Sequence, residues 1–249
     1  MLRRRPTPRG AVADANPSAT DEAFRVLRSN LLVLLADLAN PVVMVTSPHE
    51  GEGKTSTCAG LAASLAFVGQ RIVAVDFDLR NPSLHQRFGA HNEFGVTSFL
   101  LDGKPLAECL QYVEIPGPGA DEQGLYLLAT GPGVHNPTEL LTADRTKRLL
   151  GVLANQADVV LVDTPPVLPV ADTLEIGRMT AGALLVVEAR RTEVGDAARA
   201  KDALIQNQTR ILGVIVNKIP PDDVSIGYGS ATPPPAIPPP MRALGRDND

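Results

Sequence analysis

Residues 42–57 read Val-Val-Met-Val-Thr-Ser-Pro-His-Glu-Gly-Glu-Gly-Lys-Thr-Ser-Thr, and this stretch decides the fold. An apolar, β-branched run ends in a glycine-rich turn, and Lys54-Thr55 opens a segment rich in alanine and leucine. A buried strand, a tight loop and a helix in this order are typical of a phosphate-binding P-loop. The strict pattern G-x-x-x-x-G-K-[ST] fails at its first position, which is Pro48. The alternative is a glycine-rich turn in an ordinary α/β domain.

The residue types of this loop suit a bound phosphate chain. Gly51 and Gly53 let backbone N–H groups curl around phosphate oxygens, and the helix starting near Lys54 points its positive end at the anion. Lys54 can reach the outer phosphates, and the Thr55 hydroxyl can bind Mg²⁺. We therefore expect these residues to bind nucleotide: Gly51, Glu52, Gly53, Lys54, Thr55 and Ser56.

Two further apolar runs end in carboxylates. Residues 71–80 read Arg-Ile-Val-Ala-Val-Asp-Phe-Asp-Leu-Arg, and residues 158–166 read Asp-Val-Val-Leu-Val-Asp-Thr-Pro-Pro. Parallel strands covered on both faces read as such continuous runs, and ligands bind beyond their carboxyl ends. Asp76, Asp78 and Asp163 should therefore reach the same edge as the P-loop, where a carboxylate can hold Mg²⁺ or accept a proton. Each aspartate alone could instead cap a helix or turn.

Composition agrees with one sizeable globular domain. The 249 residues are 44% hydrophobic, and the net charge of −5 argues against nucleic acid as a partner. The only cysteines are Cys58 and Cys109, which indicates a reducing cytosol and no disulfide framework; Cys58 should be a small buried side chain. The sequence has no apolar run of roughly 18 residues that could cross a bilayer. The basic residues 2–5 precede no apolar core, so they are not a secretory signal.

The order of the segments predicts a doubly wound, mostly parallel α/β sheet. We expect a flexible basic arm over residues 1–18, the P-loop domain over 19–220 and a flexible proline-rich tail over 221–249. Besides the strands already described, the expected elements are a helix at 20–39, short helices within 82–111, a strand at 125–129, a helix from about 136 to 155, a helix at 172–180, strands at 183–188 and 211–217, and a helix at 194–206.

Taken together, these segments resemble the bacterial tyrosine kinases that regulate capsule and exopolysaccharide synthesis, which belong with MinD and ParA proteins to the deviant P-loop ATPases. The resemblance covers roughly residues 21–220. It rests on the Walker A-like residues 46–55, the Walker A′-like residues 75–82 with His85, the Walker B-like residues 162–166 with Asp172, and the segments 136–141 and 22–30.

The resemblance implies ATP·Mg²⁺-dependent transfer of a phosphoryl group to tyrosine. It implies Lys54, Asp76 and Asp78 as catalytic residues, with one of the two aspartates orienting or deprotonating the tyrosine; we favour Asp78. It implies Thr55, Asp163 and Asp76 as metal-binding residues. Asn217, at the end of the last strand, would face the adenine ring as in related ATPases, although an Asn there could equally form a turn.

Glu22, Arg25 and Arg28 step by three along the first expected helix and share one broad face. Glu22 can pair with Arg25, which leaves Arg28 free for a partner carboxylate; a solvated helix face is the alternative. The resemblance implies that this segment builds a ring of subunits. It also implies a separate membrane adaptor that holds the protein at the inner face of the cell membrane, and a tyrosine phosphatase is a further possible partner.

The chain departs from these kinases in its C-terminal tyrosines, since they carry a cluster and this chain has only Tyr228 there. Its flanking glycines make the segment flexible enough to enter a neighbour's site, so Tyr228 is the expected phosphoacceptor, unless it is a remnant. Tyr126 falls in a strand pattern and should be packed. The alternatives are an ATPase switch of the MinD/ParA type without kinase activity and a nucleotide-holding scaffold without turnover.

Overall fold

The computed structural model describes residues 17–36, 38, 41–116, 123–134, 140 and 143–220. Three of the expectations above lie outside these residues. They are the arm before Pro17, the segment 136–139 and the tail that carries Tyr228.

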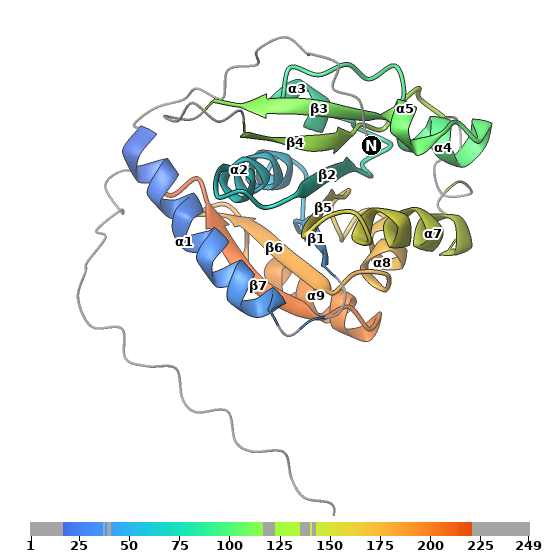
Figure 1. Cartoon of the computed structure of the whole chain (residues 1–249). Coiled ribbons are helices and arrows are strands. Elements are labelled where there is room, and N and C mark those ends of the chain that lie inside the picture. Colours follow the sequence, from blue (N-terminus) through green and yellow to red (C-terminus); the bar gives the residue numbers. More distant parts are fainter. Residues whose placement is uncertain are drawn as a thin grey trace, which may run out of the picture. The chain divides into compact units, whose positions relative to one another are not determined.

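The described residues form a seven-stranded sheet in the order β3-β4-β2-β5-β1-β6-β7 (Figure 1). All neighbouring strands run parallel except β3 and β4, which are antiparallel. The predicted doubly wound, mostly parallel sheet is confirmed. The strands are β1 (Val42–Thr46), β2 (Ile72–Asp76), β3 (Leu110–Ile115), β4 (Gln123–Leu128), β5 (Val159–Asp163), β6 (Gly182–Glu188) and β7 (Ile211–Asn217).

Helices cover both faces of this sheet, as Figure 1 shows. Strand β1 needs cover on both faces, because its alternate side chains belong to two different hydrophobic cores. Val43 and Val45 pack with the helices α1 and α2, whereas Val42 and Met44 belong to the core that includes α7, α8 and α9. The helices are α1 (Pro17–Leu35), α2 (Lys54–Phe67), α3 (Leu84–Arg87), α4 (Val96–Asp102), α5 (Leu106–Cys109), α7 (Ala143–Ala154), α8 (Asp172–Gly177) and α9 (Val194–Gln206).

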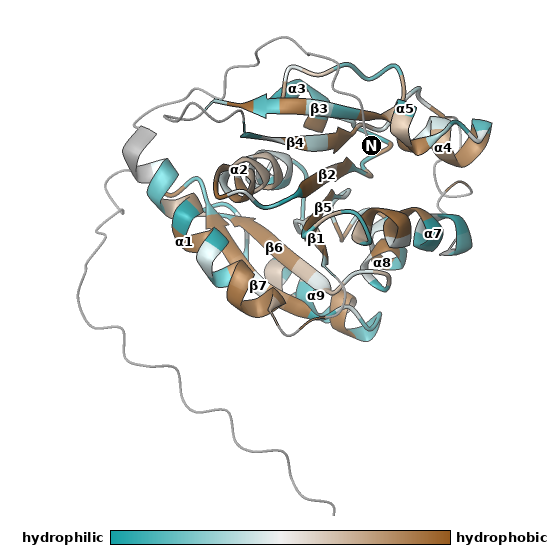
Figure 2. Ribbon diagram, in the orientation of Figure 1, coloured by the Kyte–Doolittle hydropathy of each residue, from teal (hydrophilic) through white to brown (hydrophobic). Residues whose placement is uncertain are grey.

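Strands β1, β2 and β5 are buried along their whole length, and the middle of the sheet is accordingly hydrophobic in Figure 2. From β1 the chain crosses over β5 to reach β2, and from β5 it crosses over β1 to reach β6. The strand order therefore reverses between β1 and β5. In open α/β sheets the ligand site lies at the carboxyl ends of the strands at such a reversal.

Two details differ from the expectation. The structure ends the short helices at Cys109 and then forms the edge strand Leu110–Ile115, which is not among the expected elements. This strand is only half-buried and pairs on one side, so its apolar pattern is weaker than that of the central strands. The first helix ends at Leu35, four residues before the expected end at Ala39. Among the described helices, none is long and apolar enough to span a membrane.

Candidate active site

The loop between β1 and α2 adopts a backbone that requires glycine at two positions. Gly51 has φ 84° and Gly53 has φ 96°, both in the left-handed region. A Cβ on Gly53 would also lie 2.0 Å from Nδ2 of Asn217. Helix α2 begins directly afterwards at Lys54, so its first N–H groups face the loop. This is the geometry in which a helix N-terminus and loop amides bind an anion.

Side chains from outside the loop hold its backbone in place. The Asn217 amide donates to the Glu52 carbonyl over 2.9 Å. The Glu52 carboxylate is buried, accepting the His49 backbone N–H at 2.8 Å and the Thr192 hydroxyl. The predicted nucleotide contacts of Glu52 and Asn217 remain predictions, and in this arrangement both side chains hold the loop. No sequence motif pointed to Thr192, which lies 140 residues away.

Lys54 lies among carboxylates at the base of the cleft. Its ammonium nitrogen is 2.8 Å from Oδ2 of Asp78, 3.3 Å from the Thr55 hydroxyl and 3.9 Å from Oδ1 of Asp163. Burial alone lowers the pKa of Lys54 and is the largest single effect, but Asp163 and Asp78 together outweigh it, so the pKa is raised. The lysine is therefore charged and held by two buried acids.

Asp76 organises the segment that follows β2. Its carboxylate accepts backbone N–H groups from Asp78 at 3.1 Å, Ser83 at 3.1 Å and Leu84 at 3.0 Å. Burial, and after it the charge of Asp163, raises the pKa of Asp76 to about 8. The three hydrogen bonds fix the turn that presents Asp78 to the cleft.

Asp163 is fully buried, and among the described residues neither of its carboxylate oxygens has a hydrogen-bond partner. Burial raises its pKa to about 6, although the Lys54 ammonium works in the opposite direction. A buried acceptor without a donor is the position that a hydrated cation satisfies. The described residues contain no cluster of three metal-ligating side chains.

A cleft of about 590 Å³ opens above these groups. Of the predicted site residues, Gly51, Gly53, Lys54, Thr55, Ser56 and Asp78 line it. The lining also includes three basic residues that are not among the predicted site residues: Arg80, Arg87 and Lys218. Arg80 is bound to the buried Asp172 at 3.0 Å, which joins the turn after β2 to α8. The adjacency of Arg80 to the Asp-x-Asp pattern, and of Lys218 to Asn217, is the signal that could have found these two residues.

The α1 segment is only partly as expected. Glu22 and Arg25 form an exposed ion pair at 3.0 Å, as predicted. The expectation that Arg28 is free is wrong, because its guanidinium donates to the backbone carbonyl and the hydroxyl of Ser64 at 3.0 and 3.1 Å. The reason is the docking of α1 on α2, in which Phe24 packs directly over a glycine of α2 and brings Arg28 within reach.

The fold and the P-loop cleft define a nucleotide-binding domain of the deviant P-loop class. In agreement, residues 43–227 match the sequence model of the CobQ/CobB/MinD/ParA nucleotide binding domain. The chain is 36% identical over 210 residues to the tyrosine-protein kinase YwqD of Bacillus subtilis, covering 84% of this chain and 86% of that protein. It is 30% identical to the tyrosine-protein kinase wzc of Salmonella typhi, of which it covers only 27%. The chain therefore belongs to the bacterial tyrosine-protein kinases, as the resemblance implied.

Solved structures give the same assignment. The kinase domain of the Escherichia coli tyrosine kinase ETK superposes with a TM-score of 0.72 at 29% identity, covering 84% of this chain and 80% of that one. The chimerical protein CapA2B2 gives a TM-score of 0.73 at 30% identity, covering 80% and 84%. The cell division ATPase MinD of Pyrococcus furiosus gives 0.61 at 21% identity, which shows a shared fold.

Proposed function

We propose that this protein is an ATP-dependent tyrosine autokinase that regulates the synthesis and export of a capsular or extracellular polysaccharide. The observation that carries the proposal is the convergence of Lys54, Asp78 and the buried Asp163 at the P-loop cleft, in a chain of the bacterial tyrosine-protein kinase family. Lys54 and the loop amides would bind the β- and γ-phosphates, because they supply the positive charge and the donors that face the cleft.

Asp78 is the carboxylate best placed to act on the acceptor, because it lines the cleft while Asp76 does not. The tyrosine oxygen would attack the γ-phosphorus as its proton passes to Asp78, and the bond from the γ-phosphorus to the β–γ bridging oxygen would break. A phosphate chain would compete with Asp78 for the Lys54 ammonium. Nucleotide binding would thereby release the carboxylate for the proton transfer.

Thr55 and Asp163 are the residues we propose for Mg²⁺, and Asp76 would lie next to them. Bound there, Mg²⁺ would neutralise charge on the phosphate oxygens. The Asp163 carboxylate supports this role, because among the described residues its oxygens accept no hydrogen bond and the Lys54 ammonium lies 3.9 Å away. Asp76 already accepts three backbone N–H groups, so we assign it mainly to holding the loop.

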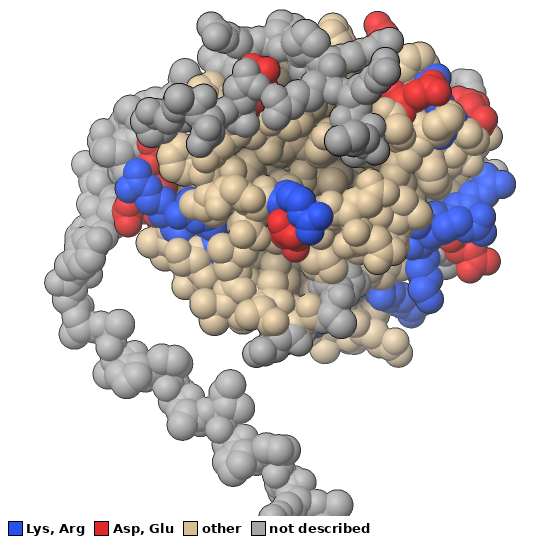
Figure 3. Space-filling model, in the orientation of Figure 1, with Lys and Arg blue, Asp and Glu red and all other residues tan. Residues whose placement is uncertain are grey.

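Self-association through α1 is the second part of the proposal. Val33 is 75% exposed and Val26 is 53% exposed on this helix, which leaves apolar surface next to the Glu22–Arg25 pair. Figure 3 shows charged side chains of both signs at the left, where α1 lies, beside a wide uncharged surface. Such a mixed surface suits contact between subunits. We further propose a membrane adaptor, a position at the inner face of the cell membrane, and reversal by a tyrosine phosphatase.

The test is incubation of the purified protein with ATP and Mg²⁺, with and without the adaptor's cytoplasmic tail. Mass spectrometry would detect phosphotyrosine, and a coupled assay would detect released phosphate. We expect phosphotyrosine in the protein. Phosphate release without phosphotyrosine would replace the kinase by an ATPase switch, and the absence of both would contradict the proposed function.

A further inference from the structure

Two consecutive residues at the end of β7 bind two consecutive carbonyl groups of the P-loop. The Asn217 amide donates to the Glu52 carbonyl at 2.9 Å, and the Lys218 ammonium donates to the Gly51 carbonyl at 2.6 Å. The four residues come from segments more than 160 positions apart in the chain. The P-loop is therefore held from one side by the last strand.

These two contacts determine which way the loop amides point. In a planar trans peptide, the C=O of one residue and the N–H of the next point in opposite directions. Holding the carbonyls of Gly51 and Glu52 towards Lys218 and Asn217 directs the N–H groups of Glu52 and Gly53 the other way. Those are the amides that a P-loop offers to phosphate oxygens.

Lys218 is itself held in position. Its ammonium also lies 2.9 Å from Oε2 of Glu188, which in turn accepts Arg191 at 3.2 Å. Glu188 lies opposite Asn217 in the β6–β7 register, so the two strand ends place the pair. Donation by Lys218 keeps the pKa of Glu188 below its ordinary value. Lys218 has φ 55°, a left-handed conformation that non-glycine residues rarely adopt and that often marks ligand sites.

We propose that Lys218 is a positioning residue for phosphate binding, held in place by Glu188, and that it acts by fixing the peptide between Gly51 and Glu52. It organises donors for the phosphate chain and does not read the base. The inference rests on the proposed nucleotide binding at the cleft. It adds a residue pair outside the P-loop, Asp-x-Asp and Walker B-like segments.

Two variants that change the net charge in opposite directions distinguish positioning of the P-loop by Lys218 from simple electrostatic attraction of the phosphate. Lys218→Met removes a positive charge, and Glu188→Gln removes a negative charge. If Lys218 only attracted the anion through its charge, Lys218→Met would weaken binding and Glu188→Gln would strengthen it. If Lys218 positions the loop, both variants weaken binding, because Glu188→Gln replaces the charge-assisted anchor of the ammonium by a weaker neutral hydrogen bond.

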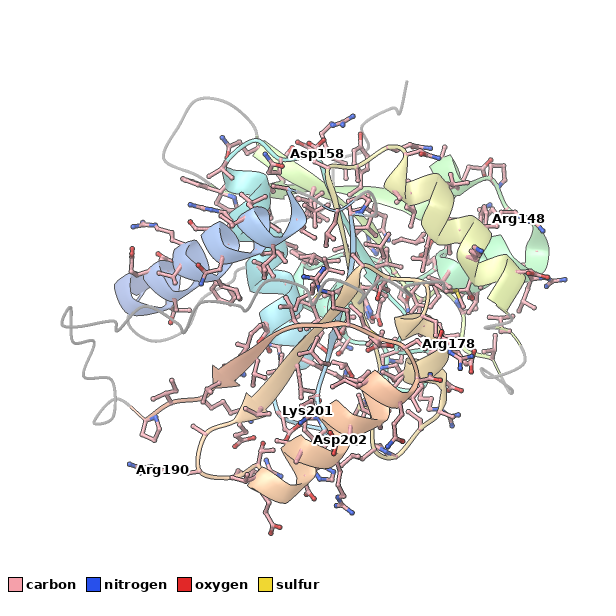
Figure 4. All side chains as sticks on the ribbon, turned by 90° about the horizontal axis from the view of Figure 1, so that it is seen from below. Arg148, Asp158, Arg178, Arg190, Lys201 and Asp202 are labelled. Carbon is pink, nitrogen blue, oxygen red and sulfur yellow. The ribbon has the colours of Figure 1, made fainter. Side chains whose placement is uncertain are left out.

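Calorimetry would measure the affinity for ADP·Mg²⁺ and for inorganic pyrophosphate with Mg²⁺. We expect Lys218→Met to lose about tenfold for both ligands, the loss expected from one charge-assisted hydrogen bond. Glu188→Gln should lose a smaller factor in the same direction. Lys201→Met is the matched control, because Lys201 lies on α9, pairs with Asp202 at 3.2 Å and does not line the cleft (Figure 4).

The outcomes are distinct. A wild type that binds neither ligand contradicts the proposed function. A wild type that binds, together with a Glu188→Gln variant that binds pyrophosphate more tightly, overturns the positioning role in favour of simple charge attraction. A Lys218→Met variant that loses ADP affinity but keeps pyrophosphate affinity shows that Lys218 acts on the nucleoside and also overturns it. If Lys218→Met does not fold, Glu188→Gln alone decides: weaker pyrophosphate binding supports the positioning role, and tighter binding supports charge attraction.

Discussion

The ammonium nitrogen of Lys54 lies 2.8 Å from Oδ2 of Asp78, so the lysine of the P-loop and the carboxylate of the neighbouring segment hold each other. Both side chains are buried, and Asp163 stands 3.9 Å from the same ammonium. One lysine thus contacts the residues that we propose for phosphate binding, for action on the acceptor and for Mg²⁺. Its removal should disturb all three.

We therefore expect Lys54→Met to lower phosphoryl transfer by at least about a hundredfold, the order of magnitude for loss of a key charge-stabilising donor. Phosphotyrosine formation from ATP·Mg²⁺ would be measured together with circular dichroism, which should show an intact α/β fold. Lys201→Met is the control, because it removes a lysine from the exposed face of α9. Undiminished phosphorylation in Lys54→Met would rule out the proposed role of the P-loop lysine.

Asp76 and Asp78 should respond differently to substitution. Asp76→Ala leaves two buried backbone N–H groups and one partly buried one without their acceptor, which should cost about 3 kcal/mol of unfolding free energy. Asp78→Ala removes one backbone contact, to Asn81, and the Lys54 pair. It should cost less than about 1.5 kcal/mol but lower turnover at least about a hundredfold. Urea unfolding and phosphotyrosine assays would check both, and equal losses of stability would contradict this division of roles.

The stability of the protein without nucleotide should fall as the pH rises. The pKa of Asp76 is raised from 3.8 to about 8 and that of Asp163 to about 6. Between the ordinary pKa of 3.8 and these raised values, the folded protein binds more protons than the unfolded chain. The free energy of unfolding therefore decreases as the pH rises through this range. We expect a lower Tm at pH 8 than at pH 5.5 by thermal scanning. Asp163→Asn should flatten this dependence, because it removes one carboxyl group with a raised pKa and also the negative charge that raises the pKa of Asp76.

The sequence was sufficient for the central part of the fold and of the site. The runs ending at Asp76 and Asp163 are short and continuously apolar because both faces of their strands are covered, and this pattern is local and readable. Edge strand β3 lacks it, since only part of its surface is buried. The sequence also does not predict contacts between side chains that are far apart along the chain. The contact of Arg28 with Ser64 depends on how α1 docks on α2. The contact of Thr192 with Glu52 depends on the path of a distant loop.

Arg25 and Arg28 give a further test, because only Arg28 joins α1 to another helix, whereas Arg25 pairs with Glu22 within α1. Arg28→Ala removes two hydrogen bonds that join α1 to α2 and should lower the unfolding free energy by about 1–2 kcal/mol. Arg25→Ala breaks an exposed pair and should cost less than about 0.5 kcal/mol. Both should weaken self-association on light scattering if α1 is a subunit contact. An Arg25→Ala protein with an unchanged oligomer would indicate that the contact lies elsewhere.

Tyr228 gives the last prediction, which rests on the sequence because this residue lies outside the described part of the chain. It is the only tyrosine of the C-terminal tail, and glycines flank it, so it can enter a catalytic cleft with little steric hindrance. Phosphorylation adds close to two negative charges at neutral pH. The Asp78 carboxylate lines the cleft at the proposed acceptor position, so it should repel the phosphorylated product and the assembly should loosen.

We therefore expect transfer to Tyr228 between subunits. Tyr228→Phe should lose most phosphotyrosine but keep ATP hydrolysis and the oligomer, since the substitution removes a single hydroxyl group. Mixing Tyr228→Phe with Lys54→Met tests transfer between chains, because the first carries an intact cleft and the second an intact acceptor. Phosphotyrosine on the Lys54→Met chain supports transfer between subunits, and its absence there limits the reaction to a single chain. Phosphotyrosine that persists undiminished in Tyr228→Phe alone would place the acceptor at Tyr112, Tyr126 or a separate substrate.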